Sequence, residues 1–161
     1  MTVLSVADAI VALRSFPRRF RELIGPPGDD DAWDRLVRTV GPGQERSALG
    51  WAARAARELA VLGQAIAALP THSTVTCSLH QAAAPLEVPT TTAVDAVLND
   101  LTTASTMAAV TSEARITSDW DRKIVVDGTA ESARDLLTRV VPMIPGHLRE
   151  IGKALDAARA R

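Results

Sequence analysis

Apolar side chains recur every three or four residues along four long stretches of the chain, which is the spacing of amphipathic helices. The first stretch covers residues 5–24, where Ser5 is a candidate N-cap and Pro17 predicts a bend because it removes an internal hydrogen bond. The second begins after another candidate cap, Ser47, and is stopped by Pro70. The first half of the chain is therefore predicted to form two well-delimited helices.

The second half of the chain carries two more such stretches. The third starts at about Thr92 and the fourth at Thr129 or its neighbours, after the segment "KIVVDG", which is typical of a short strand or an extended loop. Pro142 and Pro145 interrupt the fourth stretch and predict a kink or a break there. The apolar face of this fourth helix is predicted to include Leu136, Leu137, Val140, Ile144, Leu148, Ile151 and Leu155.

Long connections separate these helices. Residues 25–46 predict a connection with one short helical turn around "DAWDRLVRTV", and residues 71–91, rich in Thr, Ser and Pro, are interpreted as irregular. Four amphipathic helices with two long connections and no internal repeat predict an all-α four-helix bundle. The chain is expected to fold as a single domain over residues 1–161.

Composition narrows the choice of core and of partners. Apolar residues make up 47% of the chain but aromatic residues only 3%, so the core has to be built from aliphatic side chains and alanine. Alanine favours helices and lets them approach closely. The formal net charge is −1 and no basic block is present, so we expect no nucleic-acid partner.

The same sequence features predict a cytoplasmic protein. Cys77 is the only cysteine, so no disulfide can close within one chain, which favours a reducing compartment. We expect no signal peptide, because Asp8 interrupts the first apolar positions and no basic residue precedes them. No apolar run approaches the length of a membrane span, so no membrane partner is expected.

Four segments resemble a known family. The stretches "VADAIVALRSFPRRFRELI", "SALGWAARAARELAVL", "DWDR" and "HLREI" occur in the order seen in the DinB/YfiT-like metalloenzyme superfamily, in its actinobacterial form related to mycothiol-dependent maleylpyruvate isomerase. The resemblance implies a four-helix bundle, often a homodimer. It also implies a divalent metal held by three histidines, one from the second helix and two from the last, and used with a low-molecular-weight thiol such as mycothiol.

The ligand positions of that family are substituted here. His147 matches the last histidine, but Met143 stands one helical turn earlier, and Arg54 stands seven residues after Ser47, where the second-helix ligand would be. A permanent cation cannot ligate a metal, and a thioether is a poor ligand for the metals concerned. We therefore predict no metal and no cofactor; the alternative is that the alignment is slipped by one helical turn.

Each candidate site residue has a functional and a structural interpretation. His147 is either a hydrogen-bonded, partly buried imidazole or a general acid or base in a pocket. Arg54 is either an exposed, solvated side chain or a group that binds a carboxylate in the former metal cavity. Trp51 either packs or walls a ligand site, and Met143 either lines that site or fills the core.

Two further groups of polar residues are weaker candidates. The segment "THSTVTCSLH" contains His72, Cys77 and His80, but no pair has a recurrent zinc-ligand spacing and no base is evident beside the thiol. Asp119 and Asp121 flank a tryptophan near the expected mouth of the bundle.

Two functional classes follow from these residues. The first is a metal-independent protein that binds a small molecule in the bundle, with His147 catalytic and Trp51, Arg54 and Met143 lining the site, for an isomerisation or a cyclisation. The second is a non-catalytic, dimeric interaction or stress-related protein. If the alignment is wrong, a thiol-dependent metalloenzyme remains as a third possibility.

Overall fold

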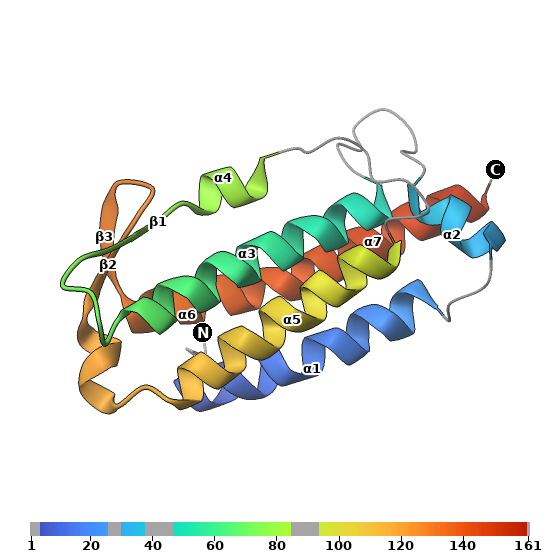
Figure 1. Cartoon of the computed structure of the whole chain (residues 1–161). Coiled ribbons are helices and arrows are strands. Elements are labelled where there is room, and N and C mark those ends of the chain that lie inside the picture. Colours follow the sequence, from blue (N-terminus) through green and yellow to red (C-terminus); the bar gives the residue numbers. More distant parts are fainter. Residues whose placement is uncertain (1–3, 26–29, 38–46, 85–93, 161) are drawn as a thin grey trace.

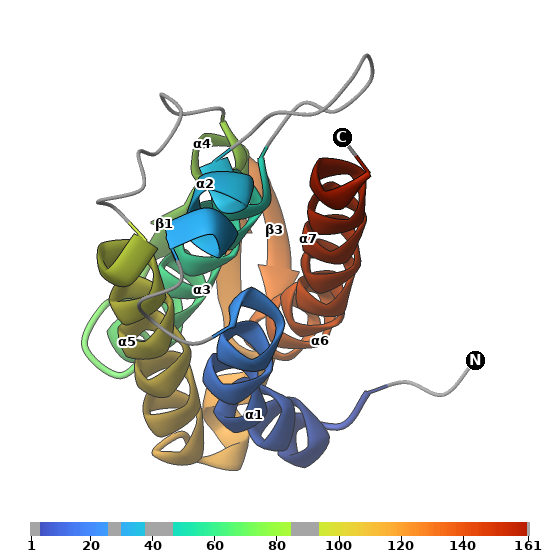
Figure 2. The same ribbon diagram turned by 90° about the vertical axis from the view of Figure 1, so that its right-hand side faces the viewer.

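The computed structural model describes residues 4–25, 30–37, 47–84 and 94–160, with the backbone alone for residues 30–33, and four long helical segments lie side by side in these ranges (Figure 1). They are α1 (Val6–Ile24), α3 (Ala48–Ala68), α5 (Val94–Glu113) and the pair α6 (Ala133–Val140) and α7 (Ile144–Arg159). Helix α3 packs against both α5 and α7, and α1 packs against α5, α6 and α7, so the four segments enclose one core (Figure 2). The predicted all-α class is confirmed.

The predicted caps of the first two helices are present. Ser5 accepts a hydrogen bond from the backbone N–H of Asp8, and Ser47 accepts one from Gly50. Helices α3 and α5 approach closely at Gly63, where an added methyl group would lie 3.2 Å from the backbone nitrogen of Ala108. Glycine at this position therefore allows the two helices to approach closely.

Helix α1 continues through Pro17, and a neighbouring helix compensates for the missing hydrogen bond. Pro17 has no N–H to donate to the carbonyl of Leu13, four residues earlier. The hydroxyl of Ser105, a fully buried residue of α5, donates to that carbonyl at 2.5 Å. This bond satisfies the carbonyl oxygen and ties α1 to α5.

The predicted break in the last helix is present. A single turn of 3-10 helix, η3 (Val141–Met143), separates α6 from α7. Pro142 lies in the first turn of η3 and Pro145 in the first turn of α7, where a backbone N–H has no partner within the helix. The residues predicted for the apolar face are buried on both sides of the break: Leu136, Leu137, Val140, Ile144, Leu148, Ile151 and Leu155.

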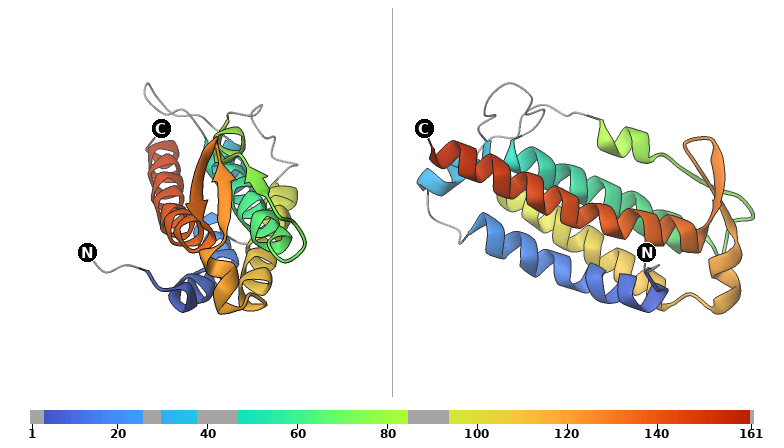
Figure 3. Two further views of the ribbon diagram at one scale, coloured as in Figure 1. Left: turned by 90° about the vertical axis from the view of Figure 1, so that its left-hand side faces the viewer. Right: turned by 180° about the vertical axis from the view of Figure 1, so that it is seen from behind.

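A small sheet lies at one end of the helices (Figure 3). Within the described residues its strands are β1 (Val75–Cys77), β2 (Lys123–Val126) and β3 (Thr129–Ser132), in the order β1-β2-β3, with β1 parallel and β3 antiparallel to β2. Asp127 and Gly128 both have positive φ and form the tight turn of the β2–β3 hairpin. The strand alternative for "KIVVDG" is therefore correct.

Two boundary predictions are wrong. The fourth helix does not begin near Thr129: residues Thr129–Ser132 pair with β2, and α6 begins at Ala133 with Ser132 as its N-cap. Residues 71–91 are not irregular throughout, because they contain β1 and the short helix α4 (Leu79–Ala83), which is capped by Ser78. Pairing between β1 and β2 joins segments far apart in the chain, which local periodicity does not reveal.

Two short helical elements complete the described fold, one of them predicted from the sequence. The predicted helical turn in the first long connection is α2 (Asp30–Val37), and a 3-10 helix, η2 (Thr117–Asp121), precedes β2. The predicted start of the third helix at Thr92 lies outside the described residues. No helix in the described part of the chain combines the length and apolar character that crossing a membrane requires.

Candidate functional site

A carboxylate and an imidazole meet between α3 and α7. Oε2 of Glu58, on α3, lies 2.6 Å from Nε2 of His147, on α7. The two side chains are 1% and 7% exposed, so the pair is almost completely removed from water. A hydrogen bond between such groups is strong, because an ionised partner in a medium of low dielectric constant is poorly screened.

Arg54 and Trp51 complete the group. Nε of Arg54 donates to Oε1 of Glu58 at 2.8 Å, one helical turn away, and the arginine side chain is 21% exposed. The indole of Trp51 stacks on the imidazole of His147, with ring centroids 5.4 Å apart and planes 28° apart. The guanidinium carbon of Arg54 lies 5.5 Å from the centre of the indole. We call these four residues the α3–α7 cluster.

Glu58 is held in its ionised form by its partners. Burial raises the pKa of this carboxyl, but the hydrogen bonds from His147 and Arg54, with the charges of both groups, outweigh burial and lower the pKa below its usual value. An ionised carboxylate can only accept hydrogen bonds. The hydrogen between Glu58 and His147 is therefore carried by Nε2 of the imidazole.

The structure brings three of the four predicted site residues together: Trp51, Arg54 and His147. Met143 is half-buried in η3, one turn before His147. The interpretation of Arg54 as an exposed, solvated side chain is wrong, because its guanidinium is bound to a buried carboxylate. The interpretation of His147 as a hydrogen-bonded, buried imidazole is correct, and it does not exclude a chemical role.

Sequence reasoning missed Glu58. Its signal was available: Glu58 stands four residues after Arg54, the spacing of a helical ion pair, and it is followed directly by Leu59, one of the apolar residues that recur along the second helical stretch. An acidic side chain next to such an apolar stripe is buried only if it is paired. Arg54 and Glu58 therefore have to be interpreted together.

The donor set of the cluster does not fit the family's metal. Glu58 and His147 are bound to each other, and the permanent cation of Arg54 lies 2.8 Å from the carboxylate that a metal would have to share. Among the residues that the structure describes, no group of three His, Cys, Asp or Glu side chains is arranged to hold a metal ion.

The weaker candidates are dispersed. His72 is exposed, with its Nδ1 2.9 Å from the hydroxyl of Thr71, and His80 is exposed on α4. Asp119 accepts the backbone N–H of Ile116 at the start of η2, and Asp121 is exposed.

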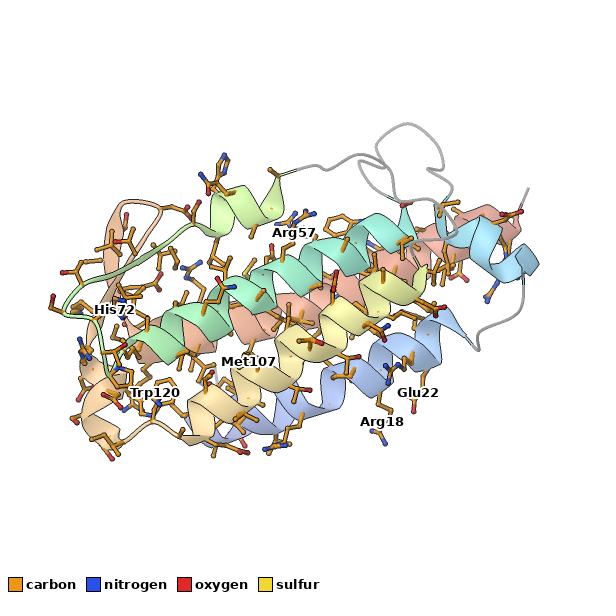
Figure 4. All side chains as sticks on the ribbon, viewed as in Figure 1. Arg18, Glu22, Arg57, His72, Met107 and Trp120 are labelled. Atoms are coloured by element: carbon orange, nitrogen blue, oxygen red, sulfur yellow. The ribbon has the colours of Figure 1, made fainter. Side chains whose placement is uncertain are left out.

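A groove of about 490 Å³ lies on another side of α3, between that helix and the segment of β1 and α4. Figure 4 shows Arg57 between α3 and α4. Its guanidinium donates to the backbone carbonyls of Ala82 and Ala84 at 2.8 and 2.9 Å, and so holds α4 over α3. We call this feature the Arg57 groove; it is lined by Arg57, Ala60, Val61, Gln64, Ala65, Ala68, Val75, Thr76, Cys77, Ser78, Gln81 and Ala82.

Cys77 is one of the residues that line this groove, and its thiol is not activated. Burial raises the pKa of the thiol, the nearby carboxylates of Asp127 and Glu131 raise it further, and Arg139 lowers it less. A thiol of raised pKa carries little thiolate at neutral pH and is a poor nucleophile.

Comparison with known proteins finds nothing similar. No family model matches the chain, and neither the curated proteins nor the solved structures yield a match.

Proposed function

We propose that the chain is a metal-independent, DinB-like cytoplasmic protein that binds a small molecule at the α3–α7 cluster and isomerises or cyclises it by proton transfer. The observation that carries this proposal is the buried hydrogen bond between Glu58 and His147, with Trp51 stacked on the imidazole. The family membership rests on the resemblance of the sequence segments and is compatible with the all-α fold.

The chemistry follows from the groups present. Histidine is the side chain that most often moves protons in catalysis, and it works best when a carboxylate fixes the ring and stabilises the imidazolium that forms. Glu58 supplies that carboxylate here. An isomerisation needs no external reagent, because one proton leaves the substrate at one atom and returns at another.

The test is ligand binding by the intact protein. Phenol, a neutral hydrogen-bond donor, and benzoate, an anion, are titrated against the isotope-labelled protein and followed by NMR. We expect phenol to perturb resonances around Trp51 and His147, and the perturbation to weaken at least about tenfold in His147→Ala, which corresponds to about 1.4 kcal/mol.

Arg54→Ala and Glu150→Gln complete that experiment. Arg54→Ala should weaken the binding of benzoate more than that of phenol, and Glu150→Gln, a change of a partly exposed residue of α7, should leave both unchanged. Unchanged binding in both His147→Ala and Arg54→Ala would overturn the proposal.

A non-catalytic function is the second candidate, and one observation favours it. The charges of Arg54 and Glu58 already satisfy each other within the chain, so the cluster needs no ligand to be stable. If neither probe binds and the cluster keeps its geometry, the four side chains serve only to hold α3 against α7, and the protein acts through its surface.

Homodimer formation is part of both candidates. Met107 and Val110, one helical turn apart on α5, are 51% and 49% exposed, and we take this face of α5 as the contact between the two copies. Light scattering at several protein concentrations measures the mass in solution. We expect a dimer that dissociates in Met107→Lys/Val110→Lys; a monomer in the wild type would exclude this assembly.

A thiol-dependent metalloenzyme is the remaining alternative, and metal analysis decides it. Protein purified without a histidine tag should contain no stoichiometric metal, because Arg54 occupies the ligand position. One equivalent of zinc, nickel or iron would overturn the metal-independent proposal.

A further inference from the structure

From the geometry of the α3–α7 cluster we infer that Nδ1 of His147 is the atom that exchanges a proton with the ligand, and that Glu58 is the positioning residue that reserves Nδ1 for this purpose by keeping Nε2 protonated. The part of this inference that concerns the ligand rests on the proposed function. The part that concerns the imidazole stands on the protein alone.

Nε2 of His147 is held by the carboxylate of Glu58. The carboxylate of Glu58 accepts two hydrogen bonds, one at each oxygen, from Arg54 and from His147. Because an ionised carboxylate has no proton to give, Nε2 is the donor whether the imidazole is neutral or charged. The second arrangement of the neutral ring, with its proton on Nδ1, would place two acceptors 2.6 Å apart and is excluded.

Nδ1 lies on the other side of the same imidazole ring. Among the residues that the structure describes, Nδ1 of His147 has no hydrogen-bond partner. In the described part of the chain, the completely buried side-chain atoms without a hydrogen-bond partner are Oγ of Ser112 and Nη1 of Arg115. Nδ1 of His147 is not among them, so this atom is not completely buried. In the neutral ring it is therefore an available acceptor.

The imidazole ring is held in place by its neighbours. Trp51 lies against the imidazole and restricts its rotation, so Nδ1 keeps a constant direction. Arg54 keeps Glu58 ionised, which preserves the acceptor that Nε2 requires. Trp51 and Arg54 thus act through Glu58 and His147.

The arrangement selects a class of ligand. A neutral Nδ1 accepts a hydrogen bond, so the ligand presents a donor there: a phenolic or enolic hydroxyl, or a C–H made acidic by an adjacent carbonyl. In the transfer, the bond from hydrogen to the ligand breaks, its electron pair stays on the ligand, and an N–H bond forms at Nδ1. The resulting imidazolium is neutralised by Glu58, and the same proton returns to another atom of the ligand, so no further reagent is needed.

NMR of the ring nitrogens tests this inference without any activity. In protein labelled with ¹⁵N in its histidines, protonated and unprotonated nitrogens are resolved, and His147→Gln assigns the signals of His147. We expect Nε2 to be protonated and the Nδ1–H form of the neutral ring to be absent. The exposed His80 serves as the internal control, because within the described residues no hydrogen bond fixes either of its ring nitrogens. A neutral ring with its proton on Nδ1 would overturn the inference.

Glu58→Gln tests the positioning role. An amide can donate as well as accept, so the preference for Nε2–H should fall by about tenfold, which corresponds to about 1.4 kcal/mol. An unchanged preference in this variant would overturn the role of Glu58, and the wild-type spectrum remains decisive if the variant does not fold.

A phenol titration of the same sample separates this inference from the proposed function. A shift of the Nδ1 signal supports both. A protonated Nε2 with no response of Nδ1 to phenol supports the role of Glu58 and overturns the exchange of a proton with a ligand at Nδ1.

Discussion

Helix α3 carries two arginines, three residues apart, in two different environments. Arg54 lies at the α3–α7 cluster and binds the buried carboxylate of Glu58. Arg57 lies at the Arg57 groove and binds the backbone carbonyls of Ala82 and Ala84. Arg54 neutralises a buried carboxylate between α3 and α7, and Arg57 holds a surface segment against α3.

The two regions differ in what happens when a polar partner is lost. At the cluster, an acid of 1% exposure depends on two partners, so that removal of any member leaves a buried charge or a buried donor. At the groove, the carbonyls that Arg57 binds belong to the short helix α4 and to its C-cap Ala84, beside an open groove where water can replace the guanidinium. The first region should therefore be intolerant of substitution and the second tolerant.

Glu58→Ala should have the largest effect. The substitution leaves the guanidinium of Arg54 and the N–H of His147 without an acceptor beside the core. Breaking a buried ion pair by removing one partner costs about 3–5 kcal/mol. Urea denaturation followed by circular dichroism measures the free energy of unfolding.

The matched control for this change is Glu150→Ala. Glu150 is a partly exposed acid on α7 whose partner is Lys153, and such pairs contribute about 0–1 kcal/mol. If Glu58→Ala costs no more than Glu150→Ala, the cluster does not stabilise the bundle and the comparison between the two regions fails.

Local sequence patterns predicted the helices but not the contacts between segments distant in the chain. The caps Ser5 and Ser47 and the break at Pro142 follow from neighbouring residues, and all three are present. The pairing of β1 with β2 depends on contacts between segments distant in the chain. The hydrogen bond by which Ser105 compensates for Pro17 also joins segments distant in the chain, so no local pattern predicts it.

The candidate site was predictable in part. The resemblance and the helical spacing placed Trp51, Arg54 and His147 in one region, and they meet there. The spacing of Glu58 from Arg54 was visible in the sequence, but only the hydrogen bond to His147 between α3 and α7 shows that this acid belongs to the site. Which acid on a helix is buried is decided by the partner helix and not by the helix itself.

Arg57→Ala should have a smaller effect, concentrated at the groove. Two hydrogen bonds from a charged donor to backbone carbonyls are lost, but the segment is partly exposed, so we expect about 1–2 kcal/mol. Amide hydrogen exchange should accelerate in α4 and remain unchanged in α7. Arg18→Ala, at an exposed pair with Glu22, is the matched control and should change neither. Acceleration that reaches α7 would show that the two sides of α3 are not independent.

Acidification should remove the stabilisation at the cluster. Because the pKa of Glu58 is lowered in the folded protein by His147 and Arg54, ionised Glu58 adds stability above its ordinary pKa of 4.5, and this contribution is lost as the pH falls through the lower pKa of the folded state. Glutamine cannot ionise, so the difference in free energy of unfolding between the wild type and Glu58→Gln should be constant at neutral pH and should narrow in acid. A difference independent of pH between neutrality and acid unfolding would contradict the lowered pKa.

The smallest effect is expected at Cys77, on the groove side of α3. Burial and the carboxylates of Asp127 and Glu131 raise the pKa of this thiol, so it should react with iodoacetamide more slowly than free glutathione at pH 8. Asp127→Asn removes one of the carboxylates and should accelerate the reaction. Asparagine tolerates the positive φ of this position and keeps an oxygen that accepts from Ser78, so the turn and the cap of α4 should survive. If Cys77 reacts as fast as glutathione in the wild type, the carboxylates do not govern its reactivity, and the groove side of α3 is more open to solvent than its contacts with α4 indicate.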